Sequence, residues 1–344
     1  MGGNAFENLR RLDAAEYVTY EAEVLQHLGQ IYQRFAPIRY YRRKPDFGDM
    51  DVVVADPALS RDDFAAFLAS IGADDVFYNK SIYSFRYQDF QVDLIHVEPQ
   101  HFDTAQFYFA YNDLNNLVGR VAHKLGVKFG WDGLTYQIRT ESGHRAQKIV
   151  LSTEPAAIYR FLGYDYSRWE QGFDTLEDIF AFVASSPYFH PELYAFENLN
   201  NINRTRNRKR KTYTAFLDWL AEHPECTAEA RHRFHADKSL YLIKLHNAFP
   251  EADLLGQLKA YAEELAAHQT RKAKFNGGLI GSWTGQSGKA LGQWIAAYTR
   301  SLGGKDALAL WLDAQTPEAI KVHFMAFYAE TQGEIDALPV RKDS

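Results

Sequence analysis

The sequence predicts an α+β protein in which a small mixed sheet is followed by an all-α C-terminal body. Short β-branched or alternating apolar runs within residues 50–97 are typical of strands. Beyond about residue 150, apolar residues recur every three or four positions, which is the period of amphipathic helices. With 344 residues, of which 46% are hydrophobic, the chain has enough core material for two or three packed units.

The first part is predicted to run helix, strand, helix, strand, strand, at residues 9–35, 50–54, 60–71, 83–87 and 90–97. Pro37 ends the first helix, because proline cannot continue the helical hydrogen-bond ladder. Ser60 can cap the second helix and Gly72 can close it. This strand, helix, strand, strand order indicates an α/β core.

The remaining predicted elements are all helices. Gly126 and Gly163 stand where helices at 113–125 and 155–161 would end, because glycine adopts the left-handed backbone of a C-cap. Further helical periods follow at 176–184, 213–222, 240–248, 254–268, 291–302 and 317–328. The second half is therefore predicted to be an all-α body.

Composition excludes several classes of protein. No apolar run approaches the ~18 to 20 residues that cross a bilayer, and the N-terminus lacks the pattern of a signal peptide. The single cysteine, Cys226, excludes an internal disulfide and a cysteine-based zinc cluster, and we expect it to be inert. These features predict a cytoplasmic protein with no membrane contact and no evident protein partner.

Three aspartates in predicted strands carry the strongest functional signal. Asp49 and Asp51 stand two positions apart in 48–54, so both point to one face while the apolar residues between them turn toward the core. Asp93 lies in the apolar run 90–97, which can pair nearby. Carboxylates held that close repel each other unless a cation lies among them, and hard oxygen ligands favour Mg²⁺ or Mn²⁺. Two ions about 3.5 to 4 Å apart can clamp an attacking hydroxyl and a leaving pyrophosphate, which is the chemistry of nucleotidyl transfer.

The alternative is that Asp49 and Asp51 only decorate the solvent face of an edge strand. Aspartate is depleted in strands, and two on one face repel each other. A third in the next apolar run would need a separate coincidence, so we favour the metal site.

Residues 42–53 resemble the catalytic segment of DNA polymerase beta-type nucleotidyltransferases, in which a Gly-Ser turn, paired arginines and a Gly-Asp-x-Asp strand occur in that order. Residues 90–94 resemble the third carboxylate strand of that family, and 108–116 its Tyr-Phe segment. The resemblance spans roughly residues 37–170 and implies a palm-like catalytic core.

The resemblance also implies roles for single residues. Asp49, Asp51 and Asp93 would be catalytic and would hold two Mg²⁺ ions, with Mn²⁺ as an alternative. Tyr108 and Phe109 would flank the sugar. The predicted nucleotide-binding residues are Arg39, Arg42, Arg43, Lys44, Gly48, Tyr108, Phe109, Asp113 over the base, and Asn116 near the primer end.

The sequence departs from the family in two ways. Neither residue of Arg39-Tyr40, where the Gly-Ser turn should fall, is glycine or serine. The basic residues near it could replace the phosphate cradle by charge, and the N-terminal Gly2-Gly3-Asn4 is a further candidate against a plain terminus. Fewer than forty residues of this sequence precede the core, so we expect it to lack the lyase and hairpin modules of repair polymerases.

Two later segments are candidates for binding nucleic acid. A basic run at 204–211 precedes an amphipathic helix and could grip a phosphate backbone without reading sequence, although a solvated surface run is the alternative. Glycine-rich residues 275–292 loosely resemble the C-terminal body of tRNA CCA-adding enzymes, with an ordinary helix-turn-helix junction as the alternative. The basic residues of the run are Arg204, Arg206, Arg208, Lys209, Arg210 and Lys211.

These observations combine into one prediction of domains and function. We expect a nucleotidyltransferase domain with an N-terminal helix at 1–150, a thumb-like helical segment at 151–200, and a helical nucleic-acid-binding body at 201–344. The predicted activity adds a nucleoside monophosphate from an NTP to the 3′ end of a nucleic acid, preferably RNA of tRNA type, with release of pyrophosphate. The alternatives are a DNA polymerase beta-like enzyme that extends DNA, transfer to a protein side chain, and an inactive nucleic-acid-binding protein.

Overall fold

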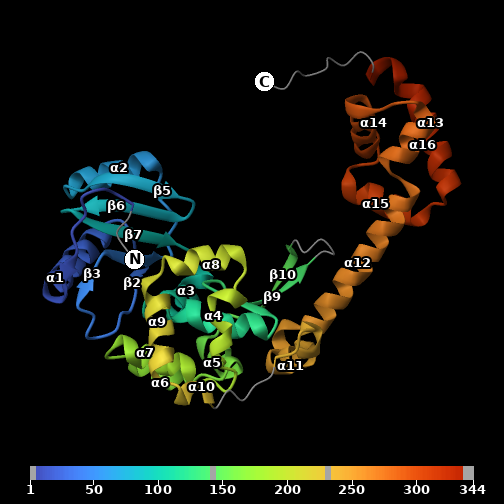
Figure 1. The fold of residues 1–344 in the computed structure, drawn as a ribbon. Helices are drawn as coiled ribbons and strands as arrows, with labels where there is room; N and C mark the ends of the chain where they lie inside the picture. Colours follow the sequence, from blue (N-terminus) through green and yellow to red (C-terminus); the bar gives the residue numbers. More distant parts are fainter. Residues whose placement is uncertain (1–4, 140–144, 229–233, 336–344) are drawn as a thin grey trace. The chain divides into compact units, whose positions relative to one another are not determined.

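The computed structural model describes residues 5–139, 145–228 and 234–335, so the candidate segment Gly2-Gly3-Asn4 lies outside the described residues. The chain forms two compact units, Met1–Leu254 and Leu255–Ser344 (Figure 1). This division does not coincide with the boundaries predicted at residues 150 and 200. The reason is that the helices just after residue 200 pack into the first unit through Tyr213 and Phe216, which are both fully buried.

The first unit is built on a five-stranded mixed sheet. Its strands are β2 (Phe35–Pro37), β4 (Asp49–Val54), β5 (Asp74–Asn79), β6 (Ile82–Tyr87) and β7 (Phe90–His96), in the order β2-β4-β7-β6-β5. The central pair β4–β7 is parallel, and the other neighbours are antiparallel. The predicted mixed sheet is therefore confirmed.

Two helices cover one face of this sheet, α1 (Ala14–Leu28) and α2 (Arg61–Ser70). Helix α1 is shorter than the predicted 9–35 at both ends. Asp13 and Glu16 form a capping box that starts it, it ends at Leu28, and Phe35–Pro37 pair with β4 as strand β2. Ser60 caps α2 as predicted, accepting a hydrogen bond from the Asp63 amide.

The opposite face of the sheet is only partly covered. Helix α3 (Phe102–Phe109) lies there, with Phe102 and Phe109 packed against a cluster that includes Val53 and Ile95. Helix α4 (Leu114–Lys124) follows. Coverage at one end of β4 and β7 leaves the other end of the same face accessible, and this is where the aspartates lie.

A second, three-stranded sheet was not predicted. It contains β8 (Val127–Gly130), β9 (Gly133–Arg139) and β10 (Arg145–Ser152), in the order β10-β9-β8. Gly133 makes the turn between β8 and β9 feasible, because its φ is +108° and a Cβ there would lie 2.4 Å from the carbonyl oxygen of Ser152. A short pair, β1 (Leu12–Asp13) with β3 (Asp46–Phe47), completes the strands of the described residues.

Helices complete the first unit. They are α5 (Pro155–Leu162), α6 (Tyr166–Gln171), α7 (Leu176–Ala184), α8 (Asn201–Arg208), α9 (Lys211–Glu222), α10 (Glu225–Ala228) and α11 (Leu242–Ala248), with short 3₁₀ turns between several of them. Gly163 has a φ of +79° and ends α5 in the left-handed conformation, as predicted. In the described part of the chain, no helix has the length and apolarity that a membrane crossing requires.

The second unit is helical, as the predicted fold class requires. It contains α12 (Leu254–Lys274, which begins at the boundary), α13 (Gly277–Thr284), α14 (Gly288–Ser301), α15 (Lys305–Ala314) and α16 (Pro317–Ile335), around a core that includes Ile280, Tyr298 and Phe324. Asn276 caps α13, and Gly285 ends it with a φ of +74°. The glycine-rich segment is therefore a helix-turn-helix junction, while its contact with RNA stays a prediction.

Candidate active site

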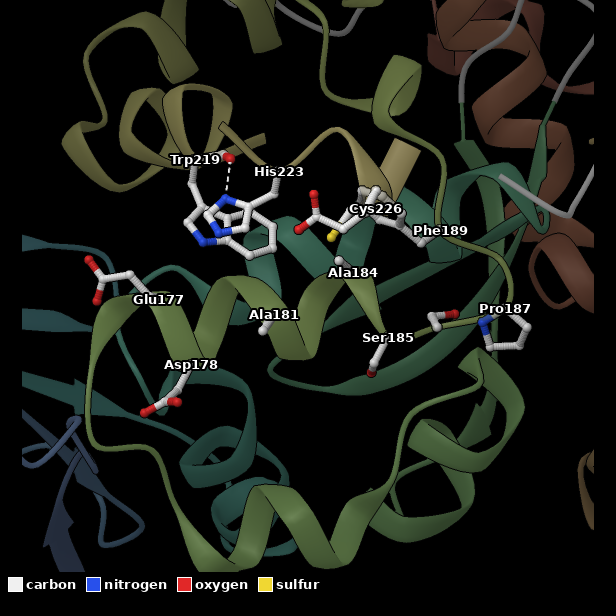
Figure 2. Close-up of a pocket in the computed structure, with 12 residues that line it drawn as sticks. Glu177, Asp178, Ala181, Ala184, Ser185, Pro187, Phe189, Trp219, His223 and Cys226 are labelled. Carbon is white, nitrogen blue, oxygen red and sulfur yellow. Dashed lines mark hydrogen bonds between the residues drawn. The ribbon is translucent and has the colours of Figure 1, made fainter. Parts of the chain in front are cut away.

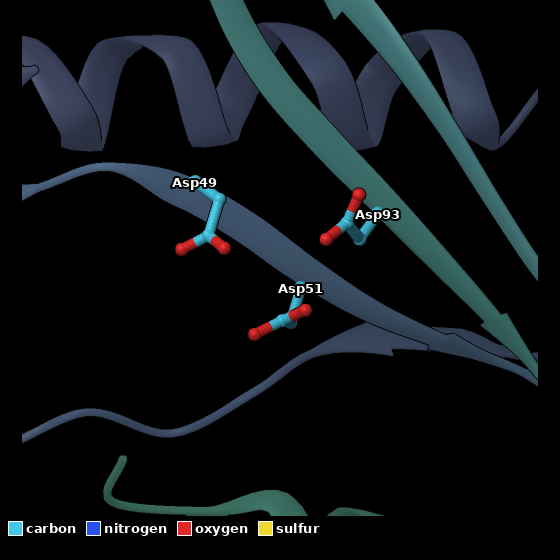
Figure 3. A group of neighbouring side chains, drawn as sticks. All are labelled: Asp49, Asp51 and Asp93. Carbon is cyan, nitrogen blue, oxygen red and sulfur yellow. The ribbon is translucent and has the colours of Figure 1, made fainter. Parts of the chain in front are cut away.

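The three predicted aspartates meet on the open face of the β4–β7 pair. In the parallel register Asp51 lies beside Asp93, and Asp49 lies beside Gln91. One carboxylate oxygen from each aspartate can be chosen so that all three oxygens lie within 4.8 Å of one another. Figure 3 shows Asp49 and Asp51 on one strand and Asp93 on its neighbour. The clustering that the sequence predicted is present.

Gln91 is a member of the site that the sequence analysis missed. Its side-chain amide donates hydrogen bonds of 2.9 Å to both oxygens of Asp93, which fixes the orientation of that carboxylate. Its position two residues before Asp93 was the available signal, because residues two apart in a strand share a face.

Burial and mutual repulsion make this cluster electrostatically unfavourable by itself. Burial, followed by repulsion from Asp49 and Asp93, raises the pKa of Asp51 well above its ordinary value. Burial also raises the pKa of Asp93 to about 6, although hydrogen bonds from Ser84 and Gln91 oppose that shift. A cation among these oxygens would neutralise their charge and so offset both effects.

The donor set suits a hard divalent cation. It consists of three carboxylates on two adjacent strands, and oxygen-only ligation favours Mg²⁺ or Mn²⁺ over metals that prefer nitrogen or sulfur. Asp49, Asp51 and Asp93 are therefore the residues that would hold such an ion.

A cavity of about 680 Å³ opens beside Asp49 and Asp51. Five predicted nucleotide-binding residues line it, namely Arg39, Lys44, Gly48, Phe109 and Asp113. Lys44 lies deep in the site, with its Nζ 4.3 Å from the centre of the Phe47 ring and 3.5 Å from Oδ1 of Asn112. Burial lowers the pKa of Lys44, and the charges of Asp49 and Asp51 oppose this shift.

Arg42 and Arg43 are not among the residues that line this cavity in the described part of the chain. Arg42 forms a 2.5 Å ion pair with Asp174. The backbone amide of Arg43 donates a 2.8 Å hydrogen bond to the backbone carbonyl of Asp174. Arg39 donates to the Glu170 carbonyl at 3.0 Å. These arginines thus tie the segment before β4 to the end of α6 and to the turn between α6 and α7.

Tyr108 and Asn116 also lie outside the lining of the cavity as far as the structure describes the chain. Tyr108 packs edge-on against Phe129, with 5.2 Å between ring centres. Burial raises the pKa of the Tyr108 phenol, and the charges of Arg206 and Arg210 oppose this. The buried Nδ2 of Asn116 has no hydrogen-bond partner among the described residues.

The six cations of the basic run do not all face the same space. Arg206, Lys209, Arg210 and Lys211 line the same cavity as Asp49 and Asp51, and Arg210 forms an ion pair with Asp113. Arg204 instead donates hydrogen bonds to carbonyl groups of its own segment, at 3.0 and 2.8 Å, and Arg208 lies over the Phe196 ring. The sequence predicted that the run belongs to a nucleic-acid-binding body at 201–344, separate from the catalytic domain. The structure differs because the apolar side of α9 packs into the first unit and carries the run to the cavity.

A larger cavity of about 780 Å³ lies elsewhere in the first unit, between α7 and the region of α9 and α10 (Figure 2). It is lined by three acidic residues, Glu177, Asp178 and Glu225, of which Asp178 is engaged in the capping box of α7. Its aromatic pair is also self-contained, because His223 stacks on Trp219 and its Nδ1 lies 2.8 Å from the Trp219 carbonyl oxygen. Cavity size therefore does not mark the reactive site, whereas the carboxylate cluster does.

The fold and the site together define an α+β protein with an acidic cluster on the open face of a mixed sheet. No protein-family model matches this chain, and no curated protein matches it. Among solved structures, it is similar to Leishmania infantum polymerase beta in a ternary gap complex, with 20% identity and a TM-score of 0.32, over 39% of this chain and 53% of that chain. It is also similar to the same polymerase in a ternary P/T complex, with 18% identity and a TM-score of 0.35, over 46% of this chain and 74% of that chain.

The similar region thus spans 53% of the first of these polymerase chains, about half its length. The predicted resemblance of the C-terminal body to tRNA CCA-adding enzymes stays a prediction.

Proposed function

We propose that this protein is a metal-dependent nucleotidyltransferase that moves a nucleoside monophosphate from an NTP to a hydroxyl group and releases pyrophosphate. One observation carries the proposal: three carboxylates on two parallel strands bring ligand oxygens within 4.8 Å of one another at the edge of a polar cavity. The same cavity contains the basic residues that a phosphate-bearing substrate requires.

The residues of the chain divide the work between metal and substrate. Asp49, Asp51 and Asp93 would hold Mg²⁺, or Mn²⁺ in its place, and two such ions would be needed to contact both reacting oxygens. When bound, the ions supply charge stabilisation for the attacking and leaving oxygens. Gln91 holds Asp93 in position, and Lys44 contributes a positive charge close to Asp49 and Asp51.

We propose the 3′ hydroxyl of a nucleic acid as the acceptor, with RNA of tRNA type preferred. The reason is the glycine-rich helix-turn-helix junction of the all-α body. Because glycine has no Cβ, the protein backbone at such a junction would be able to approach the phosphates of an acceptor closely. A DNA 3′ end and a protein hydroxyl are the competing acceptors within the same chemistry.

Transfer from labelled nucleotides tests this function directly. The full chain is incubated with each α-labelled NTP and dNTP, with Mg²⁺ or Mn²⁺, and with bulk tRNA, primed DNA or no added acceptor. We expect label to enter RNA only when metal is present, with stoichiometric pyrophosphate. Asp218→Asn, an exposed carboxylate on α9, is the matched control for Asp51→Asn.

Two results would contradict the proposal. Unchanged transfer by Asp51→Asn would show that the carboxylate cluster is not the catalytic site. Nucleic-acid binding by the wild type without any transfer would favour the inactive binding protein. Label in DNA or in the chain itself would keep the chemistry and change the acceptor.

A further inference from the structure

The cavity beside Asp49 and Asp51 is lined by acidic and basic residues together. The carboxylates of β4 are among the acidic ones. The end of α8, the start of α9 and the turn between them contribute four cations, which we call the cationic wall: Arg206, Lys209, Arg210 and Lys211. A ligand that suits both groups carries several negative charges together with a bound cation.

Most of the cationic wall is available to a ligand. In the described part of the chain, no carboxylate forms an ion pair with Arg206, Lys209 or Lys211, and all three side chains are exposed. Arg210 is the exception, because it pairs with Asp113 inside the cavity. That pair shows that a side chain of the wall can reach an anion within this space.

The backbone adds to the positive potential. Lys211 and Thr212 are the first residues of α9, a helix of 12 residues, and both line the cavity. The positive end of the helix dipole is therefore directed at the same space as the side-chain cations. The three exposed cations and this helix end belong to one continuous segment, 206–212, so they keep their spacing.

We propose that the cationic wall binds the polyphosphate tail of the incoming nucleotide, rather than the backbone of the acceptor that the sequence predicted for this run. The inference rests on the proposed function, since it names the partner of the same site. The carboxylates would hold the metal ions and the cationic wall would bind phosphate oxygens, so a metal-bound polyphosphate would be matched by both groups of residues.

Binding of inorganic tripolyphosphate tests the cationic wall without any transfer reaction. Affinity of the full chain is measured by calorimetry, in Mg²⁺ and separately in chelator. The variant neutralises the three exposed cations, as Arg206→Gln, Lys209→Gln and Lys211→Gln. The control neutralises the same number of exposed cations outside the cavity and outside the basic run, as Lys128→Gln, Lys272→Gln and Lys321→Gln.

We expect the cavity variant to lose about tenfold or more in tripolyphosphate affinity, because each exposed ion pair contributes up to several-fold. The control should lose about twofold at most, through its change in net charge. Equal losses in the two variants, or no loss in the cavity variant, would overturn the inference. The inference would also be overturned if the cavity variant bound oligonucleotides more weakly but kept its tripolyphosphate affinity. The cationic wall would then be a binding site for the acceptor backbone.

The result stays distinct from the fate of the proposed transfer activity. Asp51→Asn should keep or gain tripolyphosphate affinity in chelator, because the cationic wall is intact and one negative charge has been removed from the cavity. If tripolyphosphate binds through the wall while no nucleotide is transferred to any acceptor, the proposed function fails and this inference stands. If nucleotide transfer occurs but neither tripolyphosphate binding nor transfer depends on the cationic wall, the proposed function stands and this inference fails.

Discussion

The two faces of the β4–β7 pair carry opposite chemistry although they share the same backbone. On one face Met50, Val52, Val92 and Leu94 are all fully buried beneath α1 and α2. On the other face Asp49, Asp51 and Asp93 lie in the half of the strands that α3 leaves accessible. Neighbouring residues of one strand therefore serve stability and chemistry in turn.

The difference between the two faces shows that consecutive residues of one strand can have separate roles, one in stability and the next in function. The apolar face gains free energy from burial, about 25 cal/mol per Å² of apolar surface. The acidic face loses free energy while no cation is bound, because burial and repulsion disfavour its charged form. Substitutions on the two faces should therefore have opposite effects on folding and on turnover.

The largest effect is expected from Asp51→Asn, which removes one ligand charge from the acidic face. Turnover should fall by about a thousandfold, because metal ions stabilise transition-state charge by several kcal/mol. The melting temperature in chelator should stay equal or rise. Initial rates of pyrophosphate release and thermal melting of the same sample measure both quantities.

A rate close to that of the wild type would show that Asp51 is not a metal ligand. A fall in melting temperature together with turnover would mean that the acidic face also holds the fold together, and the contrast between the faces would disappear.

Met50→Ala tests the apolar face between the two aspartates. It should cost about 2 to 5 kcal/mol in the free energy of unfolding, since it leaves a cavity at a fully buried position. Metal affinity of the folded protein should change little, because Met50 points away from the carboxylates. Denaturant unfolding and Mn²⁺ titration at a temperature where the variant is folded give the two values.

Asp93→Asn should change how the free energy of unfolding depends on pH when no divalent cation is added. The folded pKa of about 6 lies above the ordinary value of 3.8, so Asp93 favours folding below pH 3.8 and this contribution is lost as the pH rises through 6. In chelator above pH 7, the variant should be more stable than the wild type by roughly 2 to 3 kcal/mol. Below pH 4 the difference should vanish.

Unfolding free energies of both proteins between pH 4 and pH 8 provide the measurement. Mg²⁺ should remove the advantage of Asp93→Asn at high pH, because the ion compensates the charge in the wild type alone. A variant that is equally destabilised at every pH would contradict the electrostatic origin.

The acidic face could be predicted from the sequence because its signal is local. Asp49 and Asp51 alternate with apolar residues, and Asp93 interrupts another apolar run, so strand periodicity alone puts them on matching faces. Strand β5 was missed because nearly all of its residues are exposed and show no alternation. Ser60 and Gly163 were read correctly as caps for the same reason of locality.

The cationic wall could not be placed in that way. The basic run 204–211 is visible in the sequence, but its distance from Asp51 depends on how α9 packs, and this depends on contacts between rings such as Phe180 and Phe216 that lie far apart in the chain. The sequence therefore identified both charged groups and missed that they share one cavity.

The smallest expected effect concerns the preference between ribose and deoxyribose in the incoming nucleotide. It tests a residue at the boundary between the part of the acidic face that α3 covers and the part that it leaves open. Phe109 belongs both to the apolar cluster around Val53 and Ile95 and to the lining of the cavity, so its ring borders the nucleotide site. Phe109→Leu should change the ratio of NTP to dNTP use by several-fold, up to roughly tenfold, since the shape of an apolar pocket discriminates by about 1 to 3 kcal/mol. Phe102→Leu is the matched control, because Phe102 lies on the same helix and in the same cluster but does not line the cavity. Competition between labelled NTP and dNTP measures the ratio independently of stability. Equal ratios in both variants would exclude Phe109 from the sugar site and leave it a core residue.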